Sequence, residues 1–393
     1  MTMDFERTLA HVRGYLADMA PGDPITLAAV GDAVNDCPWL LGTVAQQQLS
    51  QLVHDYLVGA GPLAGLLRDP TVTDVVVNGP ADVWVERGHG LEPAQVQFDS
   101  EQHVRACAQR LAATAGRALD DAHPWVDAGL PDGRRLHAVI APIAVGCTAI
   151  SIRALPASRF TLADLTRLGM LTAQSLALVQ GLVLQRRALL ITGGTGSGKT
   201  TFLDCLLGVC DTNDRVVIAE DTTELSAATA NVVRMQTRSA GHGGRGAVTL
   251  ADLVRQALRM RPDRVVVGEV RGVEIVDLLM AMNTGHTGGM ATLHANRASH
   301  VPTRVQLLGA ASGLSAEVLD VALGSAIQAI IHLDRDAHGV RRVREIGVPL
   351  VRDDRLMVRP GWLLGDGSVD EEAVVRLADL ASVSAEEAVS PGP

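Results

Sequence analysis

The strongest chemical signal in the chain is a glycine-rich segment with one lysine, between an apolar run and a predicted helix. The apolar run 188–192 precedes a segment that matches the pattern G-x-x-x-x-G-K-[ST] in full. Its members are Gly193, Gly194, Thr195, Gly196, Ser197, Gly198, Lys199, Thr200 and Thr201. Glycines let successive backbone N–H groups converge on a phosphate, and the helix N-terminus adds positive potential. The pattern therefore predicts a site for a nucleoside triphosphate, with Lys199 on the β- and γ-phosphates and Thr200 on Mg²⁺.

Acidic residues follow the next apolar run. The run 215–219 leads directly to Glu220, Asp221 and, three residues further on, Glu224. Ligands of an open parallel sheet lie beyond the carboxyl ends of its strands, so we expect these acids to face the phosphates. We predict that Glu220 and Asp221 help to hold Mg²⁺, partly through water, and that Glu224 assists proton transfer. A solvated acidic turn is the alternative.

A third apolar run ends in a single carboxylate. The segment 264–268 is followed by Glu269, and Gly268 occupies the position where most enzymes of this kind carry a metal-binding aspartate. Glu269 must then activate water, hold Mg²⁺ through water, or do both. Arg271 lies two residues further on, where it could neutralise phosphate or pair with Glu274.

Two histidines lie eight residues apart in the segment 284–296. His286 and His294 could belong to a metal site, but no third ligand stands at a suitable spacing. Beside a phosphate-binding loop, sensing of the γ-phosphate is the better interpretation, because an imidazole bonds differently to a triphosphate and a diphosphate.

The elements that must position these residues follow from the pattern. From residue 188 the order is strand, glycine-rich turn, helix, strand, helix, strand, which predicts a parallel sheet covered by helices. Before it, helical spacing over 4–19 and 43–58 is followed by alternating strands, a helix and turns. We predict a helical segment over 1–58, an α+β domain over 59–155, a linker over 156–175, an α/β nucleotide-binding domain over 176–350 and a partly disordered tail over 351–393.

Composition argues against several classes of protein. The 393 residues are 47% hydrophobic, which argues against a disordered chain, and the net charge of −10 argues against a nucleic-acid-binding protein. The five cysteines form no Cys-x-x-Cys pair, so neither a zinc site nor a disulfide framework is predicted. No targeting segment and no membrane-spanning run is predicted.

Taken together, the four motifs resemble those of the secretion ATPase superfamily, which powers type II and type IV secretion and pilus assembly. The Walker A loop, acidic box, Walker B strand and His box of that superfamily stand here as GGTGSGKTT, EDTTE, VVVGEVRG and TGHTGGMATLHAN. The sharpest resemblance, over about residues 60–350, is to the CpaF/TadA-type ATPases of tight-adherence pili.

The resemblance implies a RecA-like ATPase domain joined to a smaller N-terminal α+β domain, with ATP and Mg²⁺ as ligands. It also implies a ring homo-hexamer in the cytoplasm, bound peripherally to the membrane through inner-membrane platform proteins. Arg135 and Arg153 match positions from which the N-terminal domain can bring arginines to the phosphates, and Arg238 is a weaker candidate for contact with phosphate. Two alternatives stay open: a RecA-like translocase acting on nucleic acid, and a nucleotide-gated switch without significant turnover.

Overall fold

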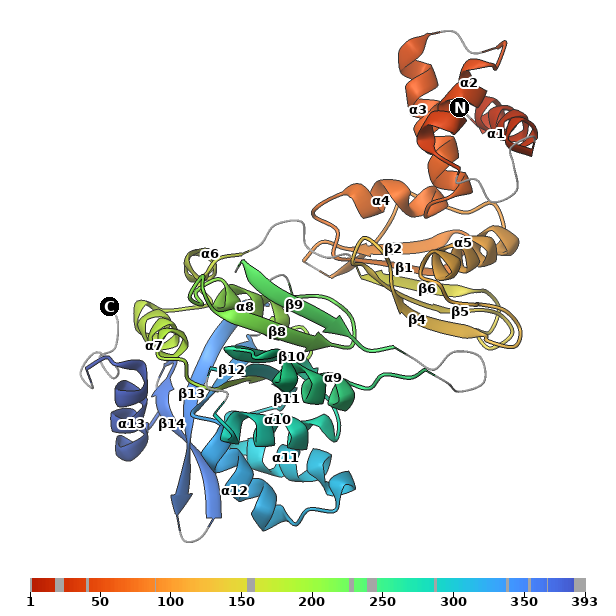
Figure 1. The fold of residues 1–393 in the computed structure, drawn as a ribbon. Helices are drawn as coiled ribbons and strands as arrows, with labels where there is room; N and C mark the ends of the chain where they lie inside the picture. The colour runs from red at the N-terminus through yellow and green to blue at the C-terminus, as the bar shows by residue number, and fades with distance from the viewer. Residues whose placement is uncertain are drawn as a thin grey trace. The chain divides into compact units, whose positions relative to one another are not determined.

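The protein divides into two compact units, Met1–Ala157 and Ser158–Pro393. The computed structural model (Figure 1) describes residues 2–17, 25–39, 42–88, 90–153, 160–225, 230–238, 246–285, 288–336, 339–352, 355–365 and 367–384. Within these ranges, no helix is both long enough and apolar enough to cross a bilayer.

The first unit contains a six-stranded antiparallel sheet with the order β3-β2-β1-β6-β5-β4. Its strands are β1 (Asp74–Gly79), β2 (Asp82–Glu86), β3 (Leu91–Pro93), β4 (Trp125–Gly129), β5 (Arg135–Val139) and β6 (Ala149–Arg153). Buried and more exposed residues alternate along β4 and β6, as expected of a sheet with one covered face. That face packs on α5 (Glu101–Thr114), near the short elements η1 (Gly61–Leu63) and α4 (Ala64–Arg68).

Three helices precede this sheet and share a small core of their own. They are α1 (Thr2–Ala17), α2 (Leu27–Asn35) and α3 (Thr43–Leu57). Val12, Val30 and Val53 are fully buried between them. The sequence predicts the first and third of these helices, but α2 was not predicted; Thr26 caps it by accepting a hydrogen bond from the backbone N–H of Ala29.

The second unit is an eight-stranded sheet with the order β14-β13-β12-β7-β11-β10-β8-β9. The first six strands along the chain are parallel, and β13 and β14 add an antiparallel edge. The strands are β7 (Leu189–Gly193), β8 (Arg215–Glu220), β9 (Asn231–Gln236), β10 (Arg264–Val270), β11 (Met290–His294), β12 (Ala329–Arg335), β13 (Arg341–Arg352) and β14 (Arg355–Leu363).

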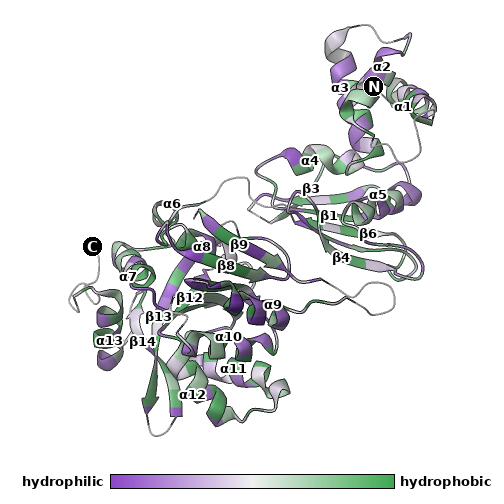
Figure 2. Ribbon diagram, viewed as in Figure 1, coloured by the Kyte–Doolittle hydropathy of each residue, from purple (hydrophilic) through white to green (hydrophobic). Residues whose placement is uncertain are grey.

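Helices cover both faces of this sheet (Figure 1). One face carries α6 (Leu162–Arg167), α7 (Ala173–Leu184), α8 (Lys199–Leu207) and α13 (Glu371–Ala381). The other carries α9 (Leu250–Ala257), α10 (Glu274–Asn283), α11 (Val301–Gly309) and α12 (Ala316–Ala326). The 3₁₀ turns are η2 (Leu258–Met260), η3 (Ala298–His300) and η4 (Ala310–Ser312). All five residues of β7 are buried, which explains the unbroken apolar run 188–192 in the sequence. In Figure 2, the similarly buried β8 is coloured mainly as hydrophobic.

The C-terminal part of the chain differs from the prediction of a partly disordered tail from residue 351. The structure has β14 at the sheet edge and α13 packed against α7, where a Cβ on Gly181 would lie 2.2 Å from the carbonyl oxygen of Ala381. The prediction failed for β14 because charged residues interrupt its apolar positions, as is common in an edge strand. Residues 385–393 lie outside the described ranges.

The predicted linker also differs from the structure. Of residues 156–175, Leu162–Arg167 form α6 and residues 173–175 begin α7, both within the second unit. Leu162, Leu165 and Leu171 are buried in the core of that unit. Residues 154–159 lie outside the described ranges.

Candidate active site

The glycine-rich loop joins β7 to α8, as the motif requires. A Cβ on Gly193 would lie 2.5 Å from both the carbonyl oxygen of Leu333 and the Oγ of Ser197. Gly196 and Gly198 have φ angles of +73° and +90°, which side-chain-bearing residues rarely adopt. Glycine is therefore required at these three positions, and the loop has the strand-turn-helix geometry of a phosphate-binding P-loop.

Lys199 lies against this loop. Its Nζ donates hydrogen bonds to the carbonyl oxygens of Gly193 and Gly194, at 3.0 and 2.8 Å. Burial lowers the pKa of Lys199, the carboxylate of Glu269 acts in the opposite direction, and Arg271 lowers it further. Lys199 is also the only lysine of the sequence, in which every other fixed cationic side chain is an arginine. The compact ammonium group of a lysine therefore occurs only at this loop, where it fits a narrow space better than a planar guanidinium would.

Thr200 and Thr201 lie in the first turn of α8, both half-buried. Their hydroxyl groups follow directly on the lysine, where the motif uses the first of them for Mg²⁺. Ser197 is buried, and its Oγ donates to the carbonyl oxygen of Gly194 at 2.9 Å, so it helps to fix the shape of the loop.

Glu269 lies at an irregularity in β10, where the register with β11 shifts between Val267 and Val270. The side chain is 31% exposed and forms an ion pair with Arg271. The buried hydroxyl of Thr292 donates to the carbonyl oxygen of Gly268 at 2.6 Å and holds the irregular backbone. The predicted pair of Arg271 and Glu274 therefore takes another form: Glu274 accepts from the backbone N–H of Arg271 at 2.6 Å, while the guanidinium binds Glu269.

Glu220 explains why residue 268 is a glycine. The side chain is buried, and its Oε1 accepts hydrogen bonds from the backbone N–H groups of Glu224 and Leu225, at 3.1 and 3.0 Å. Burial raises the pKa of Glu220 to about 7. A Cβ on Gly268 would lie 2.8 Å from the Cγ of Glu220, so the space of an aspartate at 268 is already filled. These contacts make Glu220 the anchor of the acidic turn; its predicted role as a Mg²⁺ ligand is untested.

The other two acids of the turn are more accessible. Asp221 is half-buried and accepts a hydrogen bond from the Oγ1 of Thr237 at 3.3 Å. Glu224 is half-buried, and its roles stay predictions. Among the described residues, no group of three His, Cys, Asp or Glu side chains gathers as a metal site. Bound Mg²⁺ in nucleotide sites usually takes one or two protein oxygens together with phosphate and water, and hydroxyl and carboxylate oxygens are present at this edge.

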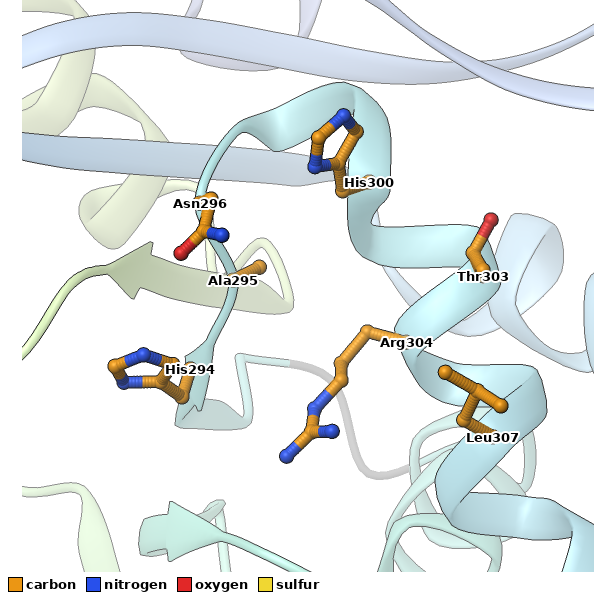
Figure 3. Close-up of a pocket in the computed structure, with 7 residues that line it drawn as sticks. All are labelled: His294, Ala295, Asn296, His300, Thr303, Arg304 and Leu307. Atoms are coloured by element: carbon orange, nitrogen blue, oxygen red, sulfur yellow. The ribbon is translucent and has the colours of Figure 1, made fainter.

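His294 ends β11 directly opposite Gly193, the first residue of the loop, in the register with β7. It lines a cavity of about 530 Å³ (Figure 3). Its predicted role as a sensor of the γ-phosphate stays a prediction. His286 lies outside the described residues, so its predicted role stays a prediction.

The predicted arginines of the first unit are engaged within their own sheet. Arg135 donates to both carboxylate oxygens of Asp127, at 3.0 and 2.8 Å. Arg153 pairs with Asp74 at 3.2 Å. Their approach to a nucleotide stays a prediction.

Arg238, in the second unit, donates through its Nε to the carbonyl oxygen of Gly246 at 2.7 Å, close to the start of α9. Its contact with phosphate likewise stays a prediction.

Two functional candidates were missed by sequence reasoning. Arg341, at the start of β13, donates through its Nε to the carbonyl oxygen of Gly196 at 2.9 Å, across 145 residues of chain. Within the described ranges it forms no ion pair. Below the loop, the Nδ1 of His332 lies 2.9 Å from the Oγ1 of Thr192. No local motif marks either residue, because each acquires its position through pairing of distant strands.

The fold and the loop define a P-loop nucleotide-binding protein with a RecA-like ATPase domain and a smaller α+β domain, as predicted. Residues 57–352 match the family described as type II/IV secretion system protein. The chain belongs to this family of secretion and pilus ATPases.

Two proteins with similar sequences are consistent with membership of this family. A putative conjugal transfer protein of Mycobacterium tuberculosis is 45% identical over 331 residues, which cover 83% of this chain and 94% of that protein. Conjugal transfer protein TrbB of Rhizobium radiobacter is 33% identical over 289 residues, which cover 71% of this chain and 84% of that protein.

Two solved structures share the fold. The pilus retraction motor PilT with bound ADP matches with a TM-score of 0.51 and 20% identity, covering 84% of this chain and 96% of that one. The ATPase DotB of Legionella pneumophila matches with a TM-score of 0.50 and 20% identity, covering 76% and 78%.

Proposed function

We propose that this protein hydrolyses ATP and uses the energy to drive secretion or pilus assembly. The carrying observation is that Glu269 of β10 and the P-loop after β7 lie at the carboxyl ends of parallel strands in one sheet. In this proposal Lys199 neutralises the β- and γ-phosphates, and Glu269 orients the attacking water. Thr200 and Glu269, with Asp221 and Glu220, would hold Mg²⁺, which supplies charge neutralisation on the phosphates.

The ion pair of Glu269 with Arg271 gives the proposal a switching step. While the guanidinium of Arg271 holds an oxygen of the Glu269 carboxylate, that oxygen is not available to orient a water molecule. The γ-phosphate carries more negative charge than a carboxylate and offers the guanidinium the same bidentate hydrogen bonding, so it competes with Glu269 for Arg271. We infer that ATP draws Arg271 to the phosphate and leaves Glu269 available for water, while His294 and His286 respond to loss of the γ-phosphate.

The assembly follows the family. We infer a ring homo-hexamer on the cytoplasmic face of the membrane, held there by inner-membrane platform proteins, and of the CpaF/TadA tight-adherence type. Relatives named for conjugal transfer and for type IV secretion support a transport role in general. For Arg135 or Arg153 to reach a nucleotide, each must exchange its carboxylate partner for phosphate.

ATP hydrolysis by the purified full-length protein tests the proposal. We expect turnover in wild type and a reduction of at least about a hundredfold in Glu269→Gln, with ATP binding retained. Glu371→Gln, an exposed glutamate in the first turn of α13, is the matched control. The mass measured in the same buffer with ATP and Mg²⁺ tests the ring. Equal turnover in wild type and Glu269→Gln would remove Glu269 from the catalytic role.

The Arg271–Glu269 pair also favours one second candidate. If the pair persists with ATP bound, the protein is a nucleotide-gated switch with little turnover. Arg271→Ala separates the two: in a motor, turnover falls because phosphate neutralisation is lost, whereas in a switch, turnover rises because Glu269 is released.

A further inference from the structure

The cavity beside the P-loop is a separate feature of the second unit. It opens where β11 ends and α11 begins, and has a volume of about 530 Å³. It is lined by His294, Ala295, Asn296, His300, Thr303, Arg304 and Leu307. Figure 3 shows His294 and Asn296 on the segment that leaves β11, and the Arg304 side chain reaching from α11 toward the same space.

The polar side chains of this cavity are not used by the rest of the described structure. Within the described ranges, His294, Asn296, His300, Thr303 and Arg304 form no side-chain hydrogen bond and no ion pair. The Nε of Arg304 is buried and lacks an acceptor there. An unpaired buried donor is unfavourable, so a ligand with acceptor oxygens would stabilise this arrangement.

The charge of the cavity has one sign. Arg304 is a permanent cation, and the described residues that line the space include no carboxylate. By contrast, the fully buried Arg264 of the same unit is paired with Asp214 at 2.6 Å, although one of its terminal nitrogens also lacks an acceptor. The planar guanidinium of an arginine suits an oxyanion, to which it can donate two parallel hydrogen bonds.

The cavity belongs to the same sheet edge as the P-loop. His294 is paired with Gly193 in the register of β11 with β7, so the cavity begins one strand away from the loop. The pKa of the neighbouring His332 is lowered mainly by burial; Asp334 opposes this, and the charges of His300, Lys199 and Arg297 lower it further. His300 of the cavity and Lys199 of the loop therefore both act electrostatically on His332.

We propose that this cavity is a binding site for inorganic phosphate, which it receives after the γ-phosphate is cleaved from the nucleotide in the P-loop. The assignment of the phosphate's source rests on the proposed ATPase function. Arg304 is the main ligand, with His300, Asn296 and Thr303 as further hydrogen-bonding groups. Phosphate held here has left the P-loop before ADP does, so the two products leave by different routes.

Phosphate binding to the full-length protein tests the site without any turnover. The protein is saturated with a non-hydrolysable ATP analogue and Mg²⁺, which fills the γ-position of the P-loop. Inorganic phosphate is then titrated by calorimetry at constant ionic strength. We expect one phosphate per chain, and affinity at least about tenfold weaker in Arg304→Gln. The matched control is Arg359→Gln on β14, because the Nε of Arg359 is also buried without a partner but lines the neighbouring groove.

A second variant covers the case in which Arg304→Gln does not fold. His300→Asn changes an exposed side chain, and we expect a loss of affinity of about threefold. Equal affinity in wild type and both variants would overturn the site. Binding to the ADP complex but not to the analogue complex would also overturn it, since the phosphate would then occupy the vacant γ-position. Absence of ATP hydrolysis would contradict the proposed function and leave the phosphate titration valid.

Discussion

The loop after β7 and the acidic turn after β8 lie at the same edge of one sheet, yet they are built in different ways. The loop is made by consecutive residues whose backbone angles demand glycine, at Gly193, Gly196 and Gly198. The turn is held by a buried carboxylate, Glu220, that packs against Gly268, which is 48 positions away on another strand. The loop can be recognised in a sequence because neighbouring residues determine its geometry. The acidic turn cannot, because it depends on the pairing of distant strands.

This difference changes the meaning of a residue. Gly268 suggests a missing metal ligand when it is considered with its sequence neighbours alone. In the structure, Gly268 has no side chain because the side chain of Glu220 occupies the space where one would lie. Likewise, the sequence suggests that Arg271 could neutralise phosphate, whereas in the structure its guanidinium forms an ion pair with Glu269.

Removing the charge from the loop should have the largest effect. We expect Lys199→Ala to weaken ATP binding at least about a hundredfold, because the ammonium interacts with two phosphate groups. A fluorescent ATP analogue measures the affinity. Because the sequence has no other lysine, an amine-reactive reagent provides a check: ATP with Mg²⁺ should protect Lys199 from modification, detected by mass spectrometry. Modification at the same rate with and without ATP would contradict the assignment.

Placing an aspartate at Gly268 should break the acidic turn. The new Cβ would overlap the Cγ of Glu220 at 2.8 Å, and a second carboxylate would adjoin a buried one. We expect Gly268→Asp to lower the free energy of unfolding by about 3 kcal/mol or more. Urea denaturation measures it, and Gly268→Ala combined with Glu220→Ala should be more stable than Gly268→Asp. A stable Gly268→Asp protein with raised turnover would mean that residue 268 is a vacant metal position after all.

Glu220 should make the stability depend on pH. Its pKa is about 7 in the folded protein, against 4.5 for an unperturbed glutamate side chain, so the folded state binds the proton more tightly than the unfolded state does. The free energy of unfolding therefore falls as pH rises from about 4.5 through about 7, and we expect a loss of about 3 kcal/mol from this group. Urea denaturation between pH 5 and pH 8 tests this, with Glu220→Gln as the comparison. An identical slope in wild type and the variant would exclude Glu220 as its source.

Arg341 should have the smallest effect. Its guanidinium supports the carbonyl of Gly196 from outside the loop, so we expect Arg341→Gln to weaken ATP binding about threefold to tenfold. Arg342→Gln is the matched control, because that neighbour pairs with Asp336 at 3.4 Å instead. If both variants bind ATP as wild type does, the contact of Arg341 with the loop has no role in binding.

The sequence was sufficient for the parts of the molecule that local chemistry determines. The P-loop, the buried parallel strands and the α/β class follow from glycine spacing and unbroken apolar runs such as 188–192. The sequence did not predict β14 or α13. Charged residues interrupt the apolar positions of β14 at the sheet edge, so the sequence shows no strand pattern there. It also missed Arg341 and His332, because strand pairing brings them to the loop from more than a hundred residues away.

The most direct test of the account is a single-turnover measurement with enzyme in excess over ATP labelled in its γ-phosphate. Acid quenching at successive times separates bound ATP from released phosphate and needs no membrane partner. We predict that wild type converts the bound ATP to ADP and phosphate, while Glu269→Gln holds it intact at least about a hundredfold longer. Equal conversion by both proteins, or ATP that stays intact in wild type, would contradict the assignment of Glu269 as the water-orienting carboxylate of an ATPase.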